Sequence, residues 1–263
     1  MIINRSFSSS FAKEERFGSL KSLVLLVVIA ILATSNSYAQ ASFETIDGLR
    51  YLIDSDAKTA TLTANVGEKY SGNIVVPEKV KASDGVEYPV TAFGDNAFKE
   101  CRGLKSITIP SSVTSLGNSC FWECSNLTSV TIPSSVTSLG DWCFKDCSSL
   151  MSITIPSSVT SLGRSCFNWC SNLTSITIPS SVTSLGYGCF SYCLGLTSIT
   201  IPSSVTSLGD YCFEGCSGLT SITIPSSVTS LGGQCFKDCS SLMSITIPSS
   251  VTSLGFGSFL NCI

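Results

Sequence analysis

The chain has 263 residues, of which 13% are charged; it contains no histidine and carries a formal net charge of −3. From Ser106 onwards three basic residues stand against six acidic ones, so the sequence offers no basic patch for duplex nucleic acid or an anionic membrane. The lack of histidine excludes Ser–His and Cys–His nucleophile pairs, and no carboxylate pair recurs at a fixed spacing. We therefore expect no enzyme, no cofactor and no nucleic-acid partner.

Residues 1–41 have the features of a signal peptide. Basic residues between Arg5 and Lys21 precede an apolar run at 23–33, LVLLVVIAILA, and small residues surround Ala39. This run suits the core of a signal peptide and is too short to span a bilayer. We expect export, cleavage close to Ala39 and no membrane span in the mature chain; an uncleaved anchor is the alternative.

Residues 42–89 are expected to form a β-rich N-terminal cap. Asp47 and Gly48 are a tight-turn signal, and residues 59–65 alternate apolar and polar side chains as a half-buried strand does. A hairpin meander at this place covers the open edge of whatever follows it.

A 23-residue repeat fills residues 90–263, beginning with a degenerate copy at 90–103. The unit reads L-T-S-I-T-I-P-S-S-V-T-S-L-G-x-x-C-F-x-x-C-x-x. A fixed period of roughly 20–50 residues is typical of a solenoid, in which each unit stacks only on its neighbours. The period is marked by Pro110, Pro133, Pro156, Pro179, Pro202, Pro225 and Pro248.

One copy indicates which residues face inward. Apolar and polar residues alternate over 127–133, so Val130 and Ile132 point into the core, and the proline ends the strand. Gly140 is expected to make a sharp corner with a positive φ, and residues 141–147, DWCFKDC, one helical or 3₁₀ turn. A single copy buries too little apolar surface to offset its chain entropy. We therefore predict a mainly β repeat solenoid with short helical or 3₁₀ turns.

The motif L-x-x-I-x-I followed by P-S-S-V-T-S-L-G-x-x-C-F-x-x-C resembles the BspA-like leucine-rich repeats of bacterial and protist surface proteins. The resemblance extends over residues 74–263, and residues 41–81 resemble the N-terminal lead-in of that family. It implies a right-handed coil of 23-residue rungs with a β-hairpin cap. It also implies secretion or surface display and adhesion to proteins or cells.

Fourteen cysteines lie in two columns of the repeat. In the first column Ala97 and Ser258 replace cysteine, so this position requires only a small, buryable side chain. The second column, from Cys101 to Cys262, is cysteine in every copy. Buried free thiols are favoured, and disulfides between or within rungs are the alternative. Metal binding is disfavoured, because histidine is lacking and the spacing is not C-x-x-C.

Aromatic residues gather at the variable positions beside the short turn, whereas the strands carry columns of hydroxyl groups such as those of Ser129 and Thr131. Varied aromatic side chains on a fixed scaffold suit recognition of proteins or carbohydrates. The structural alternative is that the rings only shield the core. The candidate binding residues are Trp122, Trp142, Trp169, Tyr187, Tyr192 and Tyr211.

Together these features predict a secreted or cell-surface, adhesin-like protein that recognises host or neighbouring-cell proteins or glycans. In the last copy Phe256 and Leu260 occupy positions that mostly hold polar or aromatic residues elsewhere, and an uncapped solenoid end tends to associate. Self-association through this C-terminal rung is therefore also expected. The alternatives are a self-assembling structural or matrix protein and, more remotely, an ice-binding protein that uses the hydroxyl columns.

Overall fold

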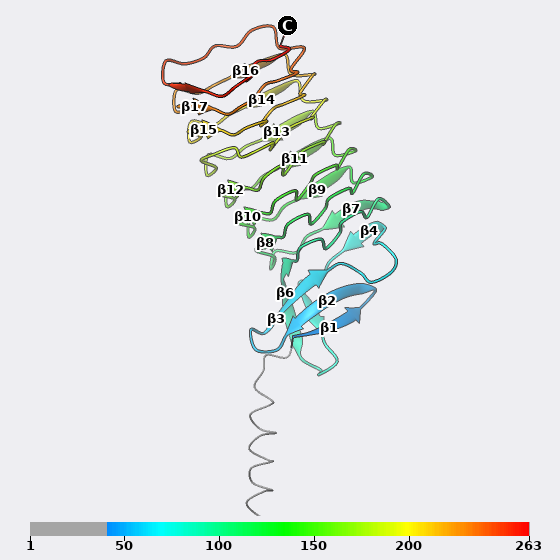
Figure 1. Cartoon of the computed structure of the whole chain (residues 1–263). Coiled ribbons are helices and arrows are strands. Elements are labelled where there is room, and N and C mark those ends of the chain that lie inside the picture. The colour runs from blue at the N-terminus through cyan, green and yellow to red at the C-terminus, as the bar shows by residue number, and fades with distance from the viewer. Residues whose placement is uncertain (1–40, 263) are drawn as a thin grey trace, which may run out of the picture. The chain divides into compact units, whose positions relative to one another are not determined.

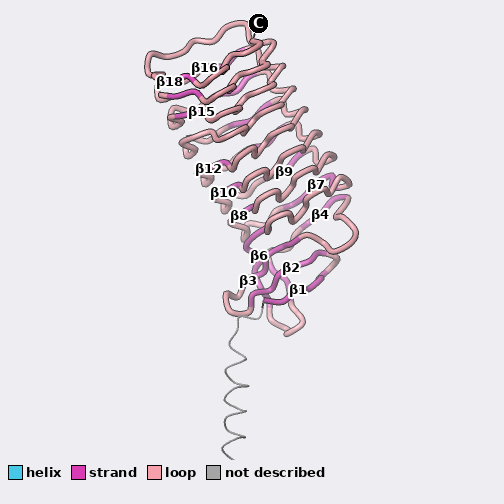
Figure 2. Tube along the Cα trace, in the orientation of Figure 1, coloured by secondary structure: helices cyan, strands magenta, loops and turns pink. Residues whose placement is uncertain are grey.

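The computed structural model describes residues 41–262, in which the chain coils as a β-solenoid of stacked rungs (Figure 1). Short strands alternate with turns and loops that make up much of each rung (Figure 2). Residues 1–40 of the predicted signal peptide lie outside the described residues. Within residues 41–262, no helix has the length and apolar character needed to cross a membrane.

The N-terminal cap begins with three strands, β1 (Ala41–Ile46), β2 (Leu49–Asp54) and β3 (Thr59–Thr63), of which β2 and β3 form an antiparallel hairpin. Asp47 and Gly48 connect β1 to β2 with φ angles of 49° and 79°. Left-handed backbone at both positions is what a two-residue hairpin turn requires. The predicted turn and hairpin are therefore confirmed.

The cap continues into the solenoid through parallel pairing. β3 lies parallel to β6 (Glu87–Phe93), and β4 (Gly72–Val75) lies parallel to β7 (Leu104–Thr108). β5 (Lys79–Lys81) pairs antiparallel with β6. Strands of the cap thus cover the edge of the first rung, which removes an exposed row of backbone hydrogen-bonding groups.

The rungs stack as parallel strands whose partners are 23 residues apart. The longer strands form a sheet in the order β16-β14-β13-β11-β9-β7-β4, in which Ile107 lies opposite Val130. The Ser-Leu strands extend the cap sheet as β6-β8-β10-β12, and a separate sheet β15-β17-β18 follows. The bounds are β8 (Ser115–Leu116), β9 (Ser129–Thr131), β10 (Ser138–Leu139), β11 (Ser152–Thr154), β12 (Ser161–Leu162), β13 (Ser175–Thr177), β14 (Ser198–Thr200), β15 (Ser207–Leu208), β16 (Ser221–Thr223), β17 (Ser230–Leu231) and β18 (Ser253–Leu254).

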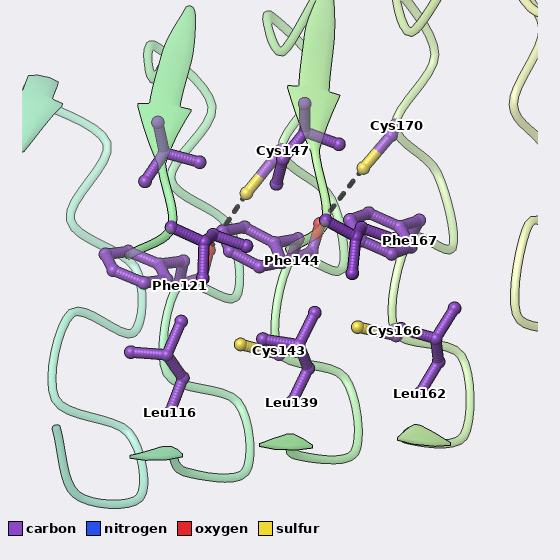
Figure 3. Close-up of a cluster of buried hydrophobic side chains, with 14 of the residues drawn as sticks. Leu116, Phe121, Leu139, Cys143, Phe144, Cys147, Leu162, Cys166, Phe167 and Cys170 are labelled. Carbon is purple, nitrogen blue, oxygen red and sulfur yellow. Dashed lines mark hydrogen bonds between the residues drawn. The ribbon is translucent and has the colours of Figure 1, made fainter. Parts of the chain in front are cut away.

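The core consists of side-chain columns that run from rung to rung (Figure 3). Phenylalanine rings of adjacent rungs stack with centroids 5.2–5.6 Å apart and interplanar angles of at most 11°. This offset stacking adds to the area that the rings bury. The sequence prediction of inward-facing residues is confirmed, since Cys143, Phe144 and Cys147 are fully buried. The stacked rings are Phe98, Phe121, Phe144, Phe167, Phe190, Phe213, Phe236 and Phe259.

Residues 141–147 do not form the helical or 3₁₀ turn that the sequence predicts; this part of the prediction is wrong. The Lys145 N–H donates within the rung to the Trp142 carbonyl at 3.1 Å, but the Phe144 N–H donates to the Cys166 carbonyl of the next rung at 2.8 Å. Because alternate N–H groups leave the rung, isolated turns form in place of a helix. These bonds add a further inter-rung ladder to those of the strands.

The predicted positive φ at Gly140 is also wrong. A Cβ atom on Gly140 would lie 2.5 Å from the carbonyl carbon of Gly117 and 2.6 Å from the nitrogen of Asn118. Glycine is needed in this column because the backbones of adjacent rungs approach closely. Gly186 is an exception, since nothing lies within 4 Å of the place where its Cβ would be.

Many of the hydroxyl groups form hydrogen bonds between neighbouring rungs. The second serine of each P-S-S-V motif donates to the valine carbonyl of the preceding rung, as Ser135 does to Val113 at 2.5 Å and Ser158 to Val136 at 2.6 Å. Such bonds satisfy carbonyls that the short strands leave unpaired. The serine content of the repeat therefore has a structural cause that is independent of any ligand.

The Ser-Leu sheet is interrupted between β12 and β15. In the rungs before the break an Asp or Asn side chain accepts the N–H of the equivalent residue one rung later. Asn118 bonds Asp141 in this way at 2.9 Å, and Asp141 bonds Arg164 at 2.7 Å. Arg164 has no acceptor atom to offer the Tyr187 N–H. This row of side-chain-to-backbone bonds consequently ends at Arg164, whose side chain cannot accept a hydrogen bond.

Candidate binding surface

Each turn segment, defined as residues 141–149 and their equivalents at 23-residue steps, holds two positions with left-handed backbone. In one rung these are Trp142 and Asp146, with φ of 56° and 58°. In other rungs glycines such as Gly188 and Gly215 occupy the same columns. A large side chain in this conformation costs on the order of 1 kcal/mol relative to glycine. Four of the six candidate rings lie in these columns: Trp142, Trp169, Tyr192 and Tyr211.

Four of the six candidate rings form two separate pairs. Trp169 stacks on Tyr192 with a centroid distance of 4.4 Å and an angle of 7°. Tyr187 packs against Tyr211 at 5.2 Å and 55°, and the guanidinium of Arg164 lies 4.9 Å from the Tyr187 ring. Within residues 41–262 no ring contact joins one pair to the other. The sequence places these residues in one variable region, but the structure separates them into two ring pairs.

Trp122 differs from the other candidates because the scaffold holds it on several sides. Its indole N–H donates to the Asp146 carboxylate at 3.0 Å. The ammonium groups of Lys99 and Lys145 lie 4.1 and 5.1 Å from the ring, within cation–π range. The side chain is half-buried. These contacts leave less of its surface for a ligand than is free on Trp142, Trp169 and Tyr187, which are 38%, 42% and 43% exposed.

A groove of about 330 Å³ lies beside Trp169, which is the one candidate ring that lines it. This volume is at the lower end of the range of about 300–1,000 Å³ that small-molecule sites have. The other lining residues escaped the sequence analysis, although their serines follow the second cysteine column at a 23-residue spacing. They are Arg102, Glu123, Ser125, Asp146, Ser148 and Ser171.

The charges in the groove are paired. Arg102 contacts the Glu123 carboxylate at 2.5 Å, and this hydrogen bond raises the pKa of the guanidinium. The Asp146 carboxylate contacts the Lys145 ammonium and accepts the Trp122 indole N–H. The groove therefore presents oxygen atoms that still have free lone pairs but little net charge.

Two other grooves of about 470 and 570 Å³ have a different lining. The first lies around Met151 and Asn172, and the second runs along the Ser-Leu strands from Ser184 to Gly255. Neither is lined by an aromatic ring, and Asp210 is the single ionisable side chain along either of them in the described chain. The groove beside Trp169 is consequently the richest of these three in groups that recognise a ligand.

The cysteines are packing groups. All fourteen are free thiols, and every one except Cys262 is buried. In the second column every thiol from Cys124 to Cys262 donates to the phenylalanine carbonyl of the preceding rung, as Cys147 does to Phe121 and Cys170 to Phe144, both at 3.1 Å (Figure 3). Burial raises the thiol pKa values, and hence the protonated form that donates this bond persists. No group of three or more potential metal ligands is arranged around an ion site in residues 41–262.

Comparison with known proteins places this geometry in a family. No curated protein matches the chain. A leucine rich cell surface protein of Faecalibacterium prausnitzii is 30% identical with a TM-score of 0.70, the match covering 85% of this chain and 75% of that one. A leucine-rich repeat protein of Bacteroides ovatus is 29% identical with a TM-score of 0.65, covering 81% and 61% of the two chains. The leucine-rich repeat protein of T. pallidum is 25% identical with a TM-score of 0.56, covering 81% and 86%.

The profile of the BspA type leucine rich repeat region, present in six copies, matches residues 85–194 and 148–263. These two ranges overlap and together extend over more than half of the sequence, and they coincide with the stacked rungs described above. The chain belongs to the BspA-type leucine-rich repeat family.

Proposed function

We propose that this protein is an exported, non-enzymatic binding protein that acts at the cell surface and recognises extracellular proteins or glycans of host or neighbouring cells. Its family and its similarity to a leucine rich cell surface protein support the surface location. The apolar run at 23–33 supports export. The non-enzymatic role is supported by the lack of histidine, which excludes Ser–His and Cys–His pairs, and by the burial of the thiols.

The observation that carries the proposal is the presence of exposed rings at left-handed backbone positions. Trp142 and Trp169 have φ angles of 56° and 59°, whereas the equivalent residues Gly188 and Gly215 show that the fold accepts glycine there. The solenoid core does not need these rings, since both are well exposed. Large side chains at strained positions that also accept glycine are expected where they serve recognition.

The test is a binding assay of the full chain against immobilised extracellular matrix proteins and cell-surface glycans. The triple variant Trp142→Ser, Trp169→Ser, Tyr187→Ser is expected to lose about tenfold or more in affinity. Its far-UV spectrum and melting temperature are expected to stay close to those of the parent protein. Met151→Ser is the matched control, because it removes an exposed apolar side chain at the other groove. Unchanged affinity of the triple variant would reject this surface.

A second candidate function, self-assembly, is favoured by the rung that contains β18. Leu254 is 56% exposed there, whereas its equivalent Leu231 is 2% exposed, and Phe256 is 88% exposed. A second copy placed on this face would bury these side chains. Light scattering at rising concentration is expected to show growth of assemblies that Phe256→Ser abolishes. If the molar mass from light scattering stays that of a monomer at all concentrations, self-assembly is rejected.

A further inference from the structure

The groove beside Trp169 brings together three kinds of group from several rungs. Carboxylates come from Glu123 and Asp146, an indole comes from Trp169, and a row of hydroxyls comes from serines at one position in three successive rungs. These serines are Ser125, Ser148 and Ser171. Hydroxyl groups both donate and accept hydrogen bonds, whereas carboxylates only accept.

The open face of Trp169 points to the kind of ligand. Tyr192 stacks nearly parallel on the indole at 4.4 Å and is not among the residues that line the groove. Tyr192 therefore covers one face of the indole, while Trp169 as a whole stays 42% exposed and lines the groove. The electron-rich face of an aromatic ring attracts polarised C–H groups, such as those on the flat side of a sugar ring.

The paired charges and the rung spacing narrow the possible classes of ligand further. Because Glu123 is bound to Arg102 and Asp146 to Lys145, a charged ligand gains little from the groove. Rungs repeat every 5.2–5.6 Å, as measured between stacked phenylalanine rings. That spacing is close to the length of one pyranose ring, whereas an extended peptide presents equivalent side chains about every 6.6–6.8 Å.

We propose that this groove binds a neutral oligosaccharide, with one sugar ring stacked on Trp169 and hydroxyl groups bonded to the Asp146 carboxylate and the serine row. The proposal rests on the proposed binding function and names the ligand class of one site. The six-residue set of acceptors, donors and ring is built from different rungs, so the scaffold fixes their spacing.

The experiment uses the full chain on an array that carries neutral glucan, mannan, xylan and N-acetylglucosamine oligomers beside sulfated glycans, sialylated glycans and charged peptides. The neutral oligomer with the strongest signal is then titrated by calorimetry. Trp169→Ala is expected to weaken binding about tenfold or more, and Trp169→Tyr, which keeps a ring, to stay within about threefold. Met151→Ala is the matched control, because this exposed apolar side chain lines a different groove; its affinity is expected to be unchanged.

Three results would overturn the saccharide proposal: no signal from any neutral oligomer, a preference for charged glycans or peptides, or equal losses in Trp169→Ala and Met151→Ala. If peptides or matrix proteins bind and that binding depends on Trp142 or Tyr187, the saccharide site fails while the binding function stands. If nothing on the array or among the matrix proteins binds, both proposals fail.

Discussion

Replacing Gly163 with alanine is the sharpest test of how the rungs fit together. A Cβ atom on Gly163 would lie 2.3 Å from the carbonyl carbon and oxygen of Gly140 and 2.4 Å from the nitrogen of Asp141. All three are backbone atoms of the preceding rung, so a rotamer change relieves nothing and the two rungs must separate.

The expected loss in the free energy of unfolding follows from the overpacking and from the hydrogen bond that this separation breaks. Overpacking costs typically about 1–3 kcal/mol. The Gly163 N–H also donates to the Leu139 carbonyl at 3.0 Å, and losing a hydrogen bond of this kind costs about 0.5–1.5 kcal/mol. We therefore expect Gly163→Ala to lower the free energy of unfolding by about 2–4 kcal/mol.

Gly186→Ala is the matched control at the same position of the next rung. Nothing lies within 4 Å of its Cβ position and its φ is not left-handed, so alanine there is expected to raise the free energy of unfolding by about 0.4–1 kcal/mol through the unfolded chain. Urea unfolding followed by far-UV circular dichroism measures both changes. Equal midpoint shifts in the two variants would refute the close approach of the rungs.

Three further predictions concern the ladders and the thiols. Arg164→Asp supplies the missing acceptor at the break in the Ser-Leu sheet, and we expect a higher melting temperature, worth about 1 kcal/mol. In urea unfolding Cys147→Ala is expected to cost about 0.5–1 kcal/mol more than Cys143→Ala, because it also removes the S–H bond to the Phe121 carbonyl. Burial raises the pKa of thiols such as Cys189 from 9.0 to about 12. Stability is therefore fully present below about pH 9 and is lost towards pH 12, by about 1.4 kcal/mol per thiol for each pH unit, which a series of melts at rising pH detects.

Each of these predictions has an outcome that contradicts it. A lower melting temperature for Arg164→Asp would mean that the break has another cause. Equal losses for the two cysteine variants would remove the distinct role of the second column. A melting temperature that does not change between pH 8 and pH 11 would show that the thiols are exposed or oxidised. Mass spectrometry after alkylation in denaturant is expected to find all fourteen thiols free.

The core was predictable from the sequence because its physics is periodic. Alternation of apolar and polar residues fixes which strand residues point inward, and the 23-residue period aligns equal residues in neighbouring rungs. The role of Gly140 was not predictable, because a left-handed φ and a close backbone contact both select glycine. The left-handed positions could not be predicted either. Residues such as Trp142 and Glu123 occupy them, so no recurring glycine marks them in the sequence.

The candidate rings were found in the sequence as variable aromatic positions, but their grouping was not. Adjacent positions of a turn segment point in different directions, so Tyr187 and Tyr192 join different pairs although they are close in sequence. The groove depends on side chains from successive rungs, such as Ser125, Ser148 and Trp169. A single copy of the repeat gives no sign of such a site, because each rung contributes only part of it.

Each 23-residue rung is expected to be an interchangeable unit stacked in parallel register. Deletion of residues 212–234 removes one whole rung, joins Tyr211 to Cys235 and leaves the groove beside Trp169 untouched. A thermal melt followed by far-UV circular dichroism is expected to show a cooperative transition at a modestly lower temperature, because one set of rung contacts is lost. A variant that lacks 11 of these residues is expected to be largely unfolded. If the 23-residue deletion unfolds the protein as thoroughly as the 11-residue deletion does, the stacked-rung account is wrong.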